Sequence, residues 1–106
     1  MEIKQYSVYW VNLDPVIGSE VSKTRPSVII SPDEMNKYMR TVIIAPVTHT
    51  LKQYPSRVPC KINGENGMIM LDQIKTVDKT RLTSHMGKLR KTESEKIKEV
   101  INDMLC

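Results

Sequence analysis

Several polar side chains suited to phosphate chemistry stand beside strand-like runs of the sequence. Arg25 precedes Pro26, which disfavours helix for the arginine and holds it extended at the start of an apolar run. Its guanidinium carries five permanently charged donors, which fit a carboxylate inside the fold or a phosphate outside it. The sequence leaves both alternatives open, the first being an ion pair with Glu20 or Asp72.

Two further strand ends carry a hydroxyl and a carboxylate. Thr48 and His49 follow one predicted strand, and Asp72 with Gln73 closes another. Strand ends on one rim of a small barrel lie within reach of one another, so these groups can converge with Arg25. Such a set suits RNA cleavage by the substrate's own 2′-hydroxyl. That reaction needs a base, a proton donor to the departing 5′ oxygen and positive charge at the phosphorus.

Each of these residues also has a structural explanation. Thr48 can be a turn hydroxyl that bonds to its own backbone, and Asp72 can cap a strand end or pair with an arginine. His49 can titrate near neutrality, although a histidine in a loop is usually only solvated. Tyr54 is a candidate to stack on a base, whereas Trp10 is expected in the core.

Charge and cysteine content narrow the class of protein. A chain of 106 residues predicts one domain, 1–106, and its net charge of +4, carried largely between the strands, fits a polyanionic partner. Cys60 and Cys106 are interpreted as free thiols, and no CxxC or HxxxH spacing predicts a metal site. The amino terminus lacks the apolar stretch of a signal peptide, and no run approaches the ~20 residues that span a bilayer. We expect a soluble, cytosolic chain.

The elements that must position these residues are short strands followed by one helix. Apolar runs predict strands at 6–13, 26–31, 41–47, 57–62 and 67–72. The motif NGENG between the last two predicts a hairpin, and Pro46 predicts an edge or a bulge. One helical turn is expected to begin at Pro32 with Ser31 as its cap, and another is expected at 78–82. A short strand or loop is expected at 83–90.

The carboxy-terminal segment has the periodicity of an amphipathic helix. Thr92 and Glu95 have capping-box spacing, and Glu93 is expected on the solvated face. The apolar stripe consists of Ile97, Val100, Ile101, Met104 and Leu105. Strands first and one helix last predict a small antiparallel sheet, curled into a barrel and closed by the helix.

Four segments, taken together, resemble a known family. VYWVNLDPVIGSE, TRPSVIISPDEMN, TVIIAPVTHT and MIMLDQIKTVDKTRL are similar, in this order, to the signature segments of MazF/PemK (Kid-like) toxins. The resemblance covers roughly residues 6–105, and the combination GSE…RP…PVT…DQ is far more specific than any one of its elements. It implies a mainly β (α+β) fold, the SH3-like barrel of plasmid-maintenance toxins with a carboxy-terminal helix. It also implies a homodimer in a bacterial cytoplasm.

The resemblance further implies a sequence-specific, metal-independent endoribonuclease toxin of a type II toxin–antitoxin system, with no cofactor. Its expected substrate is single-stranded RNA, usually messenger, cut to a 2′,3′-cyclic phosphate and a 5′-hydroxyl, which would inhibit translation and growth. The expected partner is a cognate antitoxin whose acidic carboxy-terminal tail blocks the RNA groove.

Matching the family's functional positions onto this chain assigns roles to individual residues. The arginine falls on Arg25, which would stabilise charge at the scissile phosphate, and the threonine falls on Thr48, which would hold a phosphate oxygen. The carboxylate after Gly-Ser falls on Glu20, and Asp72 matches an aspartate of the Kid-like branch. Because a guanidinium is a poor base at neutral pH, the base stays open between Glu20, Asp72 and Arg25.

The chain departs from the Kid-like branch at two positions. A histidine of that branch is replaced by Ser19 and an arginine by Met70, so an acid–base scheme built on those groups does not apply. Residues 14–24 are expected to be a lid over the RNA, and loop 48–56 to recognise bases. The expected RNA-binding residues are Ser19, Lys23, His49, Lys52, Tyr54, Gln73 and Lys75.

The alternative is a toxin of the CcdB type, which shares the fold but inhibits DNA gyrase without enzymatic activity. It would act through the helix end at Met104, Leu105 and Cys106, and Arg25 and Thr48 would then have no role. The RP and PVT segments favour the ribonuclease.

Overall fold

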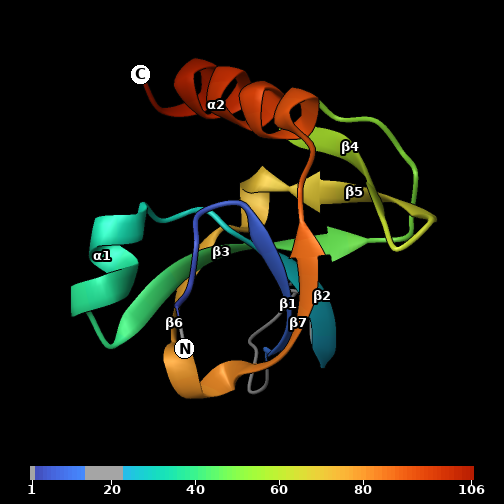
Figure 1. Cartoon of the computed structure of the whole chain (residues 1–106). Coiled ribbons are helices and arrows are strands. Elements are labelled where there is room, and N and C mark those ends of the chain that lie inside the picture. The colour runs from blue at the N-terminus through green and yellow to red at the C-terminus, as the bar shows by residue number, and fades with distance from the viewer. Residues whose placement is uncertain (1, 14–22) are drawn as a thin grey trace.

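The computed structural model describes residues 2–13 and 23–106, which form a curled antiparallel sheet with two helices (Figure 1). The strands are β1 (Ser7–Asn12), β2 (Thr24–Ile29), β3 (Thr41–Thr48), β4 (Arg57–Ile62), β5 (Glu65–Met70), β6 (Lys75–Asp78) and β7 (Leu82–Lys88). The helices are α1 (Asp33–Tyr38) and α2 (Lys91–Leu105), with 3₁₀ turns η1 (Leu71–Gln73) and η2 (Lys79–Arg81). None of the described helices is long and apolar enough to span a membrane.

Strand β3 is the axis of the sheet. The strand order is β4-β5-β3-β2-β1-β7, and β6 pairs with the first half of β3. On this side the β6 ladder ends at Ile44 and the β5 ladder begins at Val47. The prediction of an edge or a bulge at Pro46 is therefore wrong. This residue lies in a central strand, opposite Ser27. It falls where β3 changes partner, so the missing N–H interrupts no ladder on that side.

The sheet is buried on both faces because adjacent residues of its strands enter different cores. The helix-side core lies between the sheet and α2 and includes Val28, Ala45, Val58, Ile69, Ile97 and Val100. The barrel-side core lies inside the curled sheet and includes Tyr9, Val11, Ile29, Ile44, Val77 and Leu82. In Figure 1, α2 lies across β4 and β5, while β1, β2, β6 and β7 curl around the second core.

Trp10 is not in the core, contrary to the sequence-based prediction. Its neighbours Tyr9 and Val11 point into the barrel-side core, so Trp10 points to the helix side, where it remains 37% exposed. Because the N-terminal strand has apolar residues on both faces, its alternation does not tell which face is covered.

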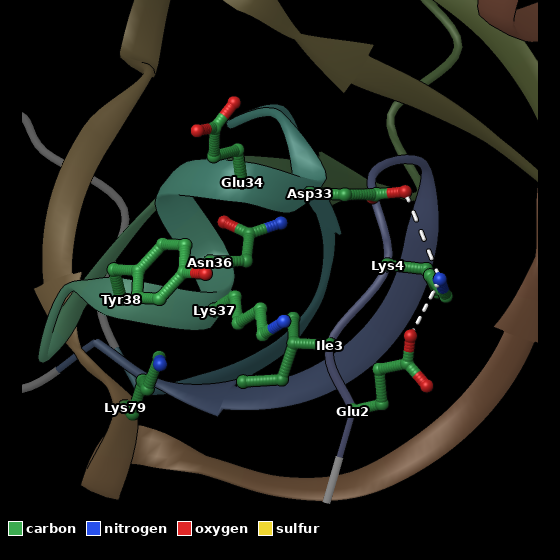
Figure 2. A pocket seen from close by; sticks show the side chains of 9 residues that line it. All are labelled: Glu2, Ile3, Lys4, Asp33, Glu34, Asn36, Lys37, Tyr38 and Lys79. Carbon is green, nitrogen blue, oxygen red and sulfur yellow. Dashed lines mark ion pairs between the residues drawn. The ribbon is translucent and has the colours of Figure 1, made fainter.

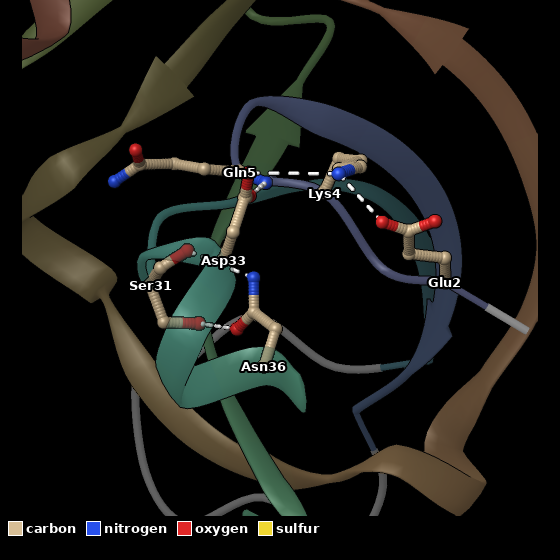
Figure 3. A network of polar contacts seen from close by, with 6 residues as sticks. All are labelled: Glu2, Lys4, Gln5, Ser31, Asp33 and Asn36. Carbon is tan, nitrogen blue, oxygen red and sulfur yellow. Dashed lines mark hydrogen bonds and ion pairs between the residues drawn. The ribbon is translucent and has the colours of Figure 1, made fainter. Parts of the chain in front are cut away.

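The turn before α1 uses Ser31 differently from the predicted cap. Pro32 is the N-cap residue, and it makes no side-chain cap bond. The Ser31 hydroxyl donates to Asn36 Oδ1 and accepts from the Ile43 N–H at 3.0 Å, while Asn36 Nδ2 donates to the Ser31 carbonyl at 2.9 Å. Figure 3 shows this network beneath Asp33. Ser31 therefore joins α1 to β3 instead of capping the helix.

Helix α2 begins with a capping box two residues earlier than predicted. Arg90 is the N-cap and Glu93 the N3 residue, in place of Thr92 and Glu95. Glu93, expected on the solvated face, is 5% exposed and accepts hydrogen bonds from Lys61 N and Arg90 N. The predicted stripe is buried at Ile97 and Val100, but its far end emerges from the core, with Leu105 63% exposed.

The remaining elements follow the prediction closely. The β4–β5 turn has only two residues, Asn63 and Gly64, whose φ values of +50° and +82° suit a type I′ hairpin. The predicted turn at 78–82 is η2, whose first N–H groups are capped when Asp78 accepts from Thr80 N at 2.9 Å. Strand β6 and turn η1 were not predicted, because four and three residues are too short for a periodic pattern.

Candidate functional site

Arg25 and Thr48 lie at corresponding positions of neighbouring strands. The β2–β3 ladder pairs Ser27 with Pro46, and extending the same register by two residues sets Arg25 opposite Thr48. Directly opposite residues of an antiparallel pair point to the same face of a sheet. The two residues therefore share one face although 23 positions separate them in the chain.

That face is the one turned away from α2. Arg25 pairs with Val11, a member of the barrel-side core, and Thr48 pairs with Met68. On the next strand Arg57 pairs with Met70, which shares the side of Met68. Arg25, Thr48 and Arg57 thus belong to a continuous surface across β2, β3 and the end of the β4–β5 hairpin.

Arg25 lies inside a strand, whereas the sequence suggested the position just before one. β2 begins at Thr24, and both Arg25 and Pro26 pair with residues of β1. Because the ladder with β3 begins only at Ser27, the missing N–H of Pro26 removes no hydrogen bond to β3. The β1 ladder and the fixed φ of Pro26 together make the backbone of Arg25 rigid.

The hydroxyl of Thr48 makes a hydrogen bond to the nearby backbone, as expected for a turn residue. The Thr50 N–H donates to Thr48 Oγ1 at 3.2 Å, and Thr48 is only 9% exposed. This bond fixes the rotamer of the hydroxyl but uses only an oxygen lone pair. A hydroxyl that accepts one bond can still donate its hydrogen to a phosphate oxygen.

Asp72 pairs with an arginine, as its structural explanation predicted, and that arginine is Arg57. Arg57 Nε lies 3.3 Å from Asp72 Oδ1, and the Ser56 hydroxyl donates to the same oxygen at 3.2 Å. Arg57 and Ser56 thus share the Oδ1 oxygen of Asp72. The contact fixes η1 against the start of β4.

Tyr54 lies under two cations. The guanidinium carbon of Arg57 lies 4.6 Å from the centre of the Tyr54 ring, and Lys52 Nζ lies 5.3 Å from it. Arg57 was not selected as a site residue from the sequence, where it is one of several basic residues between strands. Its position at the start of a predicted strand, three residues after Tyr54, was the available signal.

His49 lines a cavity on the helix side of the sheet. Its Nε2 is 3.8 Å from a carboxylate oxygen of Glu65, and both side chains are exposed. The cavity measures about 230 Å³ and is lined by the side chains of Trp10, Pro26, Val47 and Met86 among others. His49 therefore faces the opposite side of β3 from Thr48, because the two are adjacent in the chain.

The other predicted RNA-binding residues are spread along the sheet. Lys23 adopts φ +67° and its carbonyl accepts from Leu13 N at 3.0 Å. Gln73 ends η1, and Lys75 begins β6 opposite Ile44 of β3. Ser19, Glu20 and most of the predicted lid 14–24 lie outside the described residues.

A larger cavity than the one beside His49 lies next to α1. Figure 2 shows this hollow of about 730 Å³ between the N-terminal segment, α1 and Lys79. Three of the six charged side chains that line it pair with one another, since Lys4 Nζ lies 2.6 Å from Glu2 and 3.9 Å from Asp33 (Figure 3). It contains none of the predicted site residues. Within residues 2–13 and 23–106, no three His, Cys, Asp or Glu side chains are grouped to hold a metal ion.

The fold and the arrangement of β2, β3 and the carboxy-terminal helix define a half-barrel of the MazF type, and a solved structure has the same fold. The crystal structure of MazF from Deinococcus radiodurans superposes with a TM-score of 0.88 at 21% identity, covering 99% of this chain and 97% of that one. A mycobacterial endoribonuclease in complex with its cognate antitoxin gives a TM-score of 0.83 at 21% identity, covering 97% and 94% of the two chains.

Sequence comparison gives the family. Residues 4–105 match the model of the PemK-like, MazF-like toxins of type II toxin–antitoxin systems, and the chain belongs to this family. It is 31% identical to the endoribonuclease EndoA of Bacillus subtilis, over all of this chain and 97% of the relative. It is 37% identical to the endoribonuclease MazF of Staphylococcus saprophyticus, over 94% of this chain and 86% of the relative. The chain is thus a homologue of two endoribonucleases.

Proposed function

We propose that the chain is a metal-independent endoribonuclease that cleaves single-stranded RNA by internal transesterification. In this reaction the 2′-hydroxyl loses its proton to a base and its oxygen attacks the adjacent phosphorus. The bond from phosphorus to the 5′ oxygen breaks, and that oxygen takes up a proton. The products are a 2′,3′-cyclic phosphate and a 5′-hydroxyl, so the atoms balance without water or a cofactor.

The β2–β3 register is the observation that carries this proposal. A guanidinium and a hydroxyl on opposite positions of two rigid strands can bind two oxygens of one phosphate. Arg25 stabilises the charge that grows on those oxygens, and Thr48 donates its hydroxyl hydrogen to one of them. Both strands belong to one sheet, so the pair is preorganised and needs little rearrangement at the moment of reaction.

We propose Glu20 as the base, and a different role for Asp72. One oxygen of Asp72 already accepts from Arg57 and Ser56. The carboxylate of Asp72 is therefore better suited to holding Arg57 than to removing a proton. Glu20→Gln should then lower kcat and remove the acidic limb of the pH–rate profile. Asp72→Asn should lower activity but leave that limb in place.

The proposed partners are those of its relatives' class: single-stranded RNA, a second copy of the chain, and an acidic antitoxin. Net charge of +4 supports binding to both RNA and an acidic tail. The RNA-binding set proposed with it is Ser19, Lys23, His49, Lys52, Tyr54, Gln73 and Lys75. Because His49 and Thr48 lie on opposite faces of β3, we expect the RNA to wrap around the end of this strand.

The decisive test uses purified protein, a long messenger-like RNA and excess EDTA, with Arg25→Ala and Thr48→Ala as variants. Mapping the ends should show cuts at a recurring short motif, each leaving a cyclic phosphate, and loss of about 10²-fold or more in kcat for each variant. Arg40→Ala, which removes an exposed positive charge at the other end of β3, is the matched control. Cutting that requires a divalent metal would contradict the mechanism.

An RNA left intact by the wild type would contradict the activity itself. If Arg25→Ala and Thr48→Ala then remained as toxic in cells as the wild type, the target would be a protein. The exposed end of α2 at Met104 and Leu105 would be the surface to examine, as in the gyrase-inhibiting alternative.

A further inference from the structure

We propose that Arg57 is a positioning residue that holds the ring of Tyr54 as a stacking platform for one RNA base. The proposal rests on the proposed ribonuclease function and adds a base-binding contact to it. It is carried by three observations: the anchor of Arg57 on Asp72, its contact with the Tyr54 ring, and the exposure of that ring.

The anchor fixes the guanidinium. The Arg57 side chain is only 16% exposed, and its Nε lies 3.3 Å from Asp72 Oδ1. The Ser56 hydroxyl reaches the same oxygen at 3.2 Å, and the Leu71 N–H donates to the Ser56 carbonyl at 3.0 Å. Side chain and backbone bonds thus join the beginning of β4 to η1, so the arginine cannot swing away from the sheet without losing its carboxylate.

The ring depends on this guanidinium. Tyr54 lies in the loop between β3 and β4, which has no ladder of its own. The Arg57 N–H donates to the Tyr54 carbonyl at 3.0 Å, and the guanidinium carbon lies 4.6 Å from the ring centre. A planar guanidinium over an aromatic ring combines stacking with cation–π attraction. Arg57 therefore sets both the backbone position and the ring orientation of Tyr54.

The ring is open to a ligand. Tyr54 is 42% exposed, and its second cation, Lys52, is an exposed side chain 5.3 Å from the ring centre. An exposed cation–π contact contributes only ~0.5–1 kcal/mol, less than the ~1–3 kcal/mol of one stacked base. A base can therefore displace the Lys52 ammonium from the ring, and the released ammonium can bind a neighbouring phosphate.

A direct phosphate contact by Arg57 is the competing interpretation, and the structure disfavours it. Asp72 already compensates the charge of Arg57, and the side chain is mostly buried. An arginine that binds RNA phosphate releases counterions, so its removal changes the salt dependence of binding. A positioning residue leaves that dependence unchanged, which makes the two roles distinguishable.

The test measures binding of an RNA that contains the mapped cleavage motif with a 2′-deoxy sugar at the scissile position, so that it is not cut. 2-Aminopurine, whose fluorescence is quenched by stacking, is moved through the sequence one position at a time. We expect quenching at one position in the wild type and its loss in Tyr54→Leu. Loss of that stacked base should raise Kd roughly 5- to 150-fold, equivalent to ~1–3 kcal/mol.

Arg57→Lys is the informative variant, because it keeps the charge beside Asp72 but loses the planar group over the ring. We expect weaker quenching at the same position and an increase in Kd of roughly 3- to 10-fold, with kcat at saturating RNA within about twofold of the wild type. In a Tyr54→Leu background the same substitution should have no further effect. Arg40→Lys, at an exposed site beside Asp78, is the matched control and should bind as the wild type does.

Three outcomes would overturn the inference: additive effects of Arg57→Lys and Tyr54→Leu, unchanged quenching in Arg57→Lys, or a salt slope smaller by about 0.7 in Arg57→Gln, which removes the charge. Arg57→Gln repeats the cycle if Arg57→Lys melts far below the wild type. A wild type that cuts RNA but shows no quenching dependent on Tyr54 overturns this inference alone. A wild type that cuts no RNA overturns the proposed function itself.

Discussion

Glu93 is the residue whose replacement should cost the most stability for the least change in shape. Its two carboxylate oxygens accept from three donors: Arg90 N at 2.9 Å, Lys61 N at 2.9 Å and Arg90 Nη2 at 2.9 Å. The carboxylate thus caps the first turn of α2 and at the same time binds an N–H group of β4. Glu93→Gln keeps the size of the side chain but places an amide NH₂ against one of these donors.

The cost can be worked from these bonds. In the better of its two orientations, the glutamine oxygen keeps Lys61 N and Arg90 Nη2, and Arg90 N loses its acceptor. One part-buried donor left unsatisfied costs about 1–3 kcal/mol, and the two remaining bonds lose their charge-assisted character. We therefore expect a loss of about 2–3 kcal/mol. In a domain of this size that loss lowers Tm by about 10–20 °C.

The effect should depend on pH in a defined direction. Burial raises the pKa of Glu93, but the hydrogen bonds from Arg90 and Lys61 outweigh it, and the pKa lies below its ordinary value of 4.5. A carboxyl whose pKa is lower in the folded state stabilises the fold above its unfolded pKa, and this contribution is lost as pH falls through the folded pKa. The difference in Tm between wild type and Glu93→Gln should be full at pH 7 and shrink below about pH 4.5.

Thermal unfolding followed by circular dichroism, at one fixed protein concentration, measures both effects. Glu95→Gln is the matched control on the same helix, because its carboxylate lies 4.0 Å from Lys91 with both side chains exposed. It should change Tm by no more than about 2 °C. If Glu93→Gln melted within 2 °C of the wild type at pH 7, the carboxylate would not join α2 to β4 as described. A difference in Tm that grew toward pH 4 would contradict the direction of the pKa shift.

Two further predictions concern the sheet and the thiols. A methyl group at Gly67 would lie 2.9 Å from Val47 Cγ1 and 3.1 Å from the Thr48 carbonyl oxygen, so Gly67→Ala should destabilise the protein by about 1–3 kcal/mol and reduce RNA cleavage by displacing Thr48; wild-type Tm and activity would refute the close packing. Burial, with the charge of Glu93, raises the pKa of the Cys60 thiol to about 12, whereas Cys106 is exposed. Iodoacetamide at pH 8 should therefore add one alkyl group to the native protein and two in denaturant, by mass spectrometry, and two in the native state would show that Cys60 is accessible.

The sequence was most informative where the pattern is local. The Asn63-Gly64 turn and the apolar residues Ile97 and Val100 of α2 can each be recognised within a few residues of chain. The family resemblance was confirmed by the match over residues 4–105, and the fold by the MazF-type half-barrel. The strands beside Arg25 and Thr48 were also predicted, but the register that sets these two residues opposite each other was not, because the sequence alone does not give the alignment of two strands.

What escaped the sequence depends on partners far along the chain. Glu93 looks like a solvated residue until Lys61, 32 positions away, supplies a buried N–H. Trp10 looks like core because an aromatic residue in a strand usually is, but its side chain remains partly exposed. Arg57 looks like one more loop cation until Asp72 and Tyr54 are brought to it. The roles of Arg25, Thr48, Glu20 and Asp72 in RNA cleavage stay predictions.

The pairing of β1 with β7 has a consequence for folding during synthesis of the chain. Ser7 pairs with Lys88, so β1 has both of its neighbouring strands only when both ends of the chain are present. Contacts of such high sequence separation form late, because a long loop must first be closed. The strand that pairs with Arg25 therefore receives its second neighbour, β7, from residues encoded near the end of the message. The sheet of this toxin-family member is thus completed only when translation of the chain is almost finished.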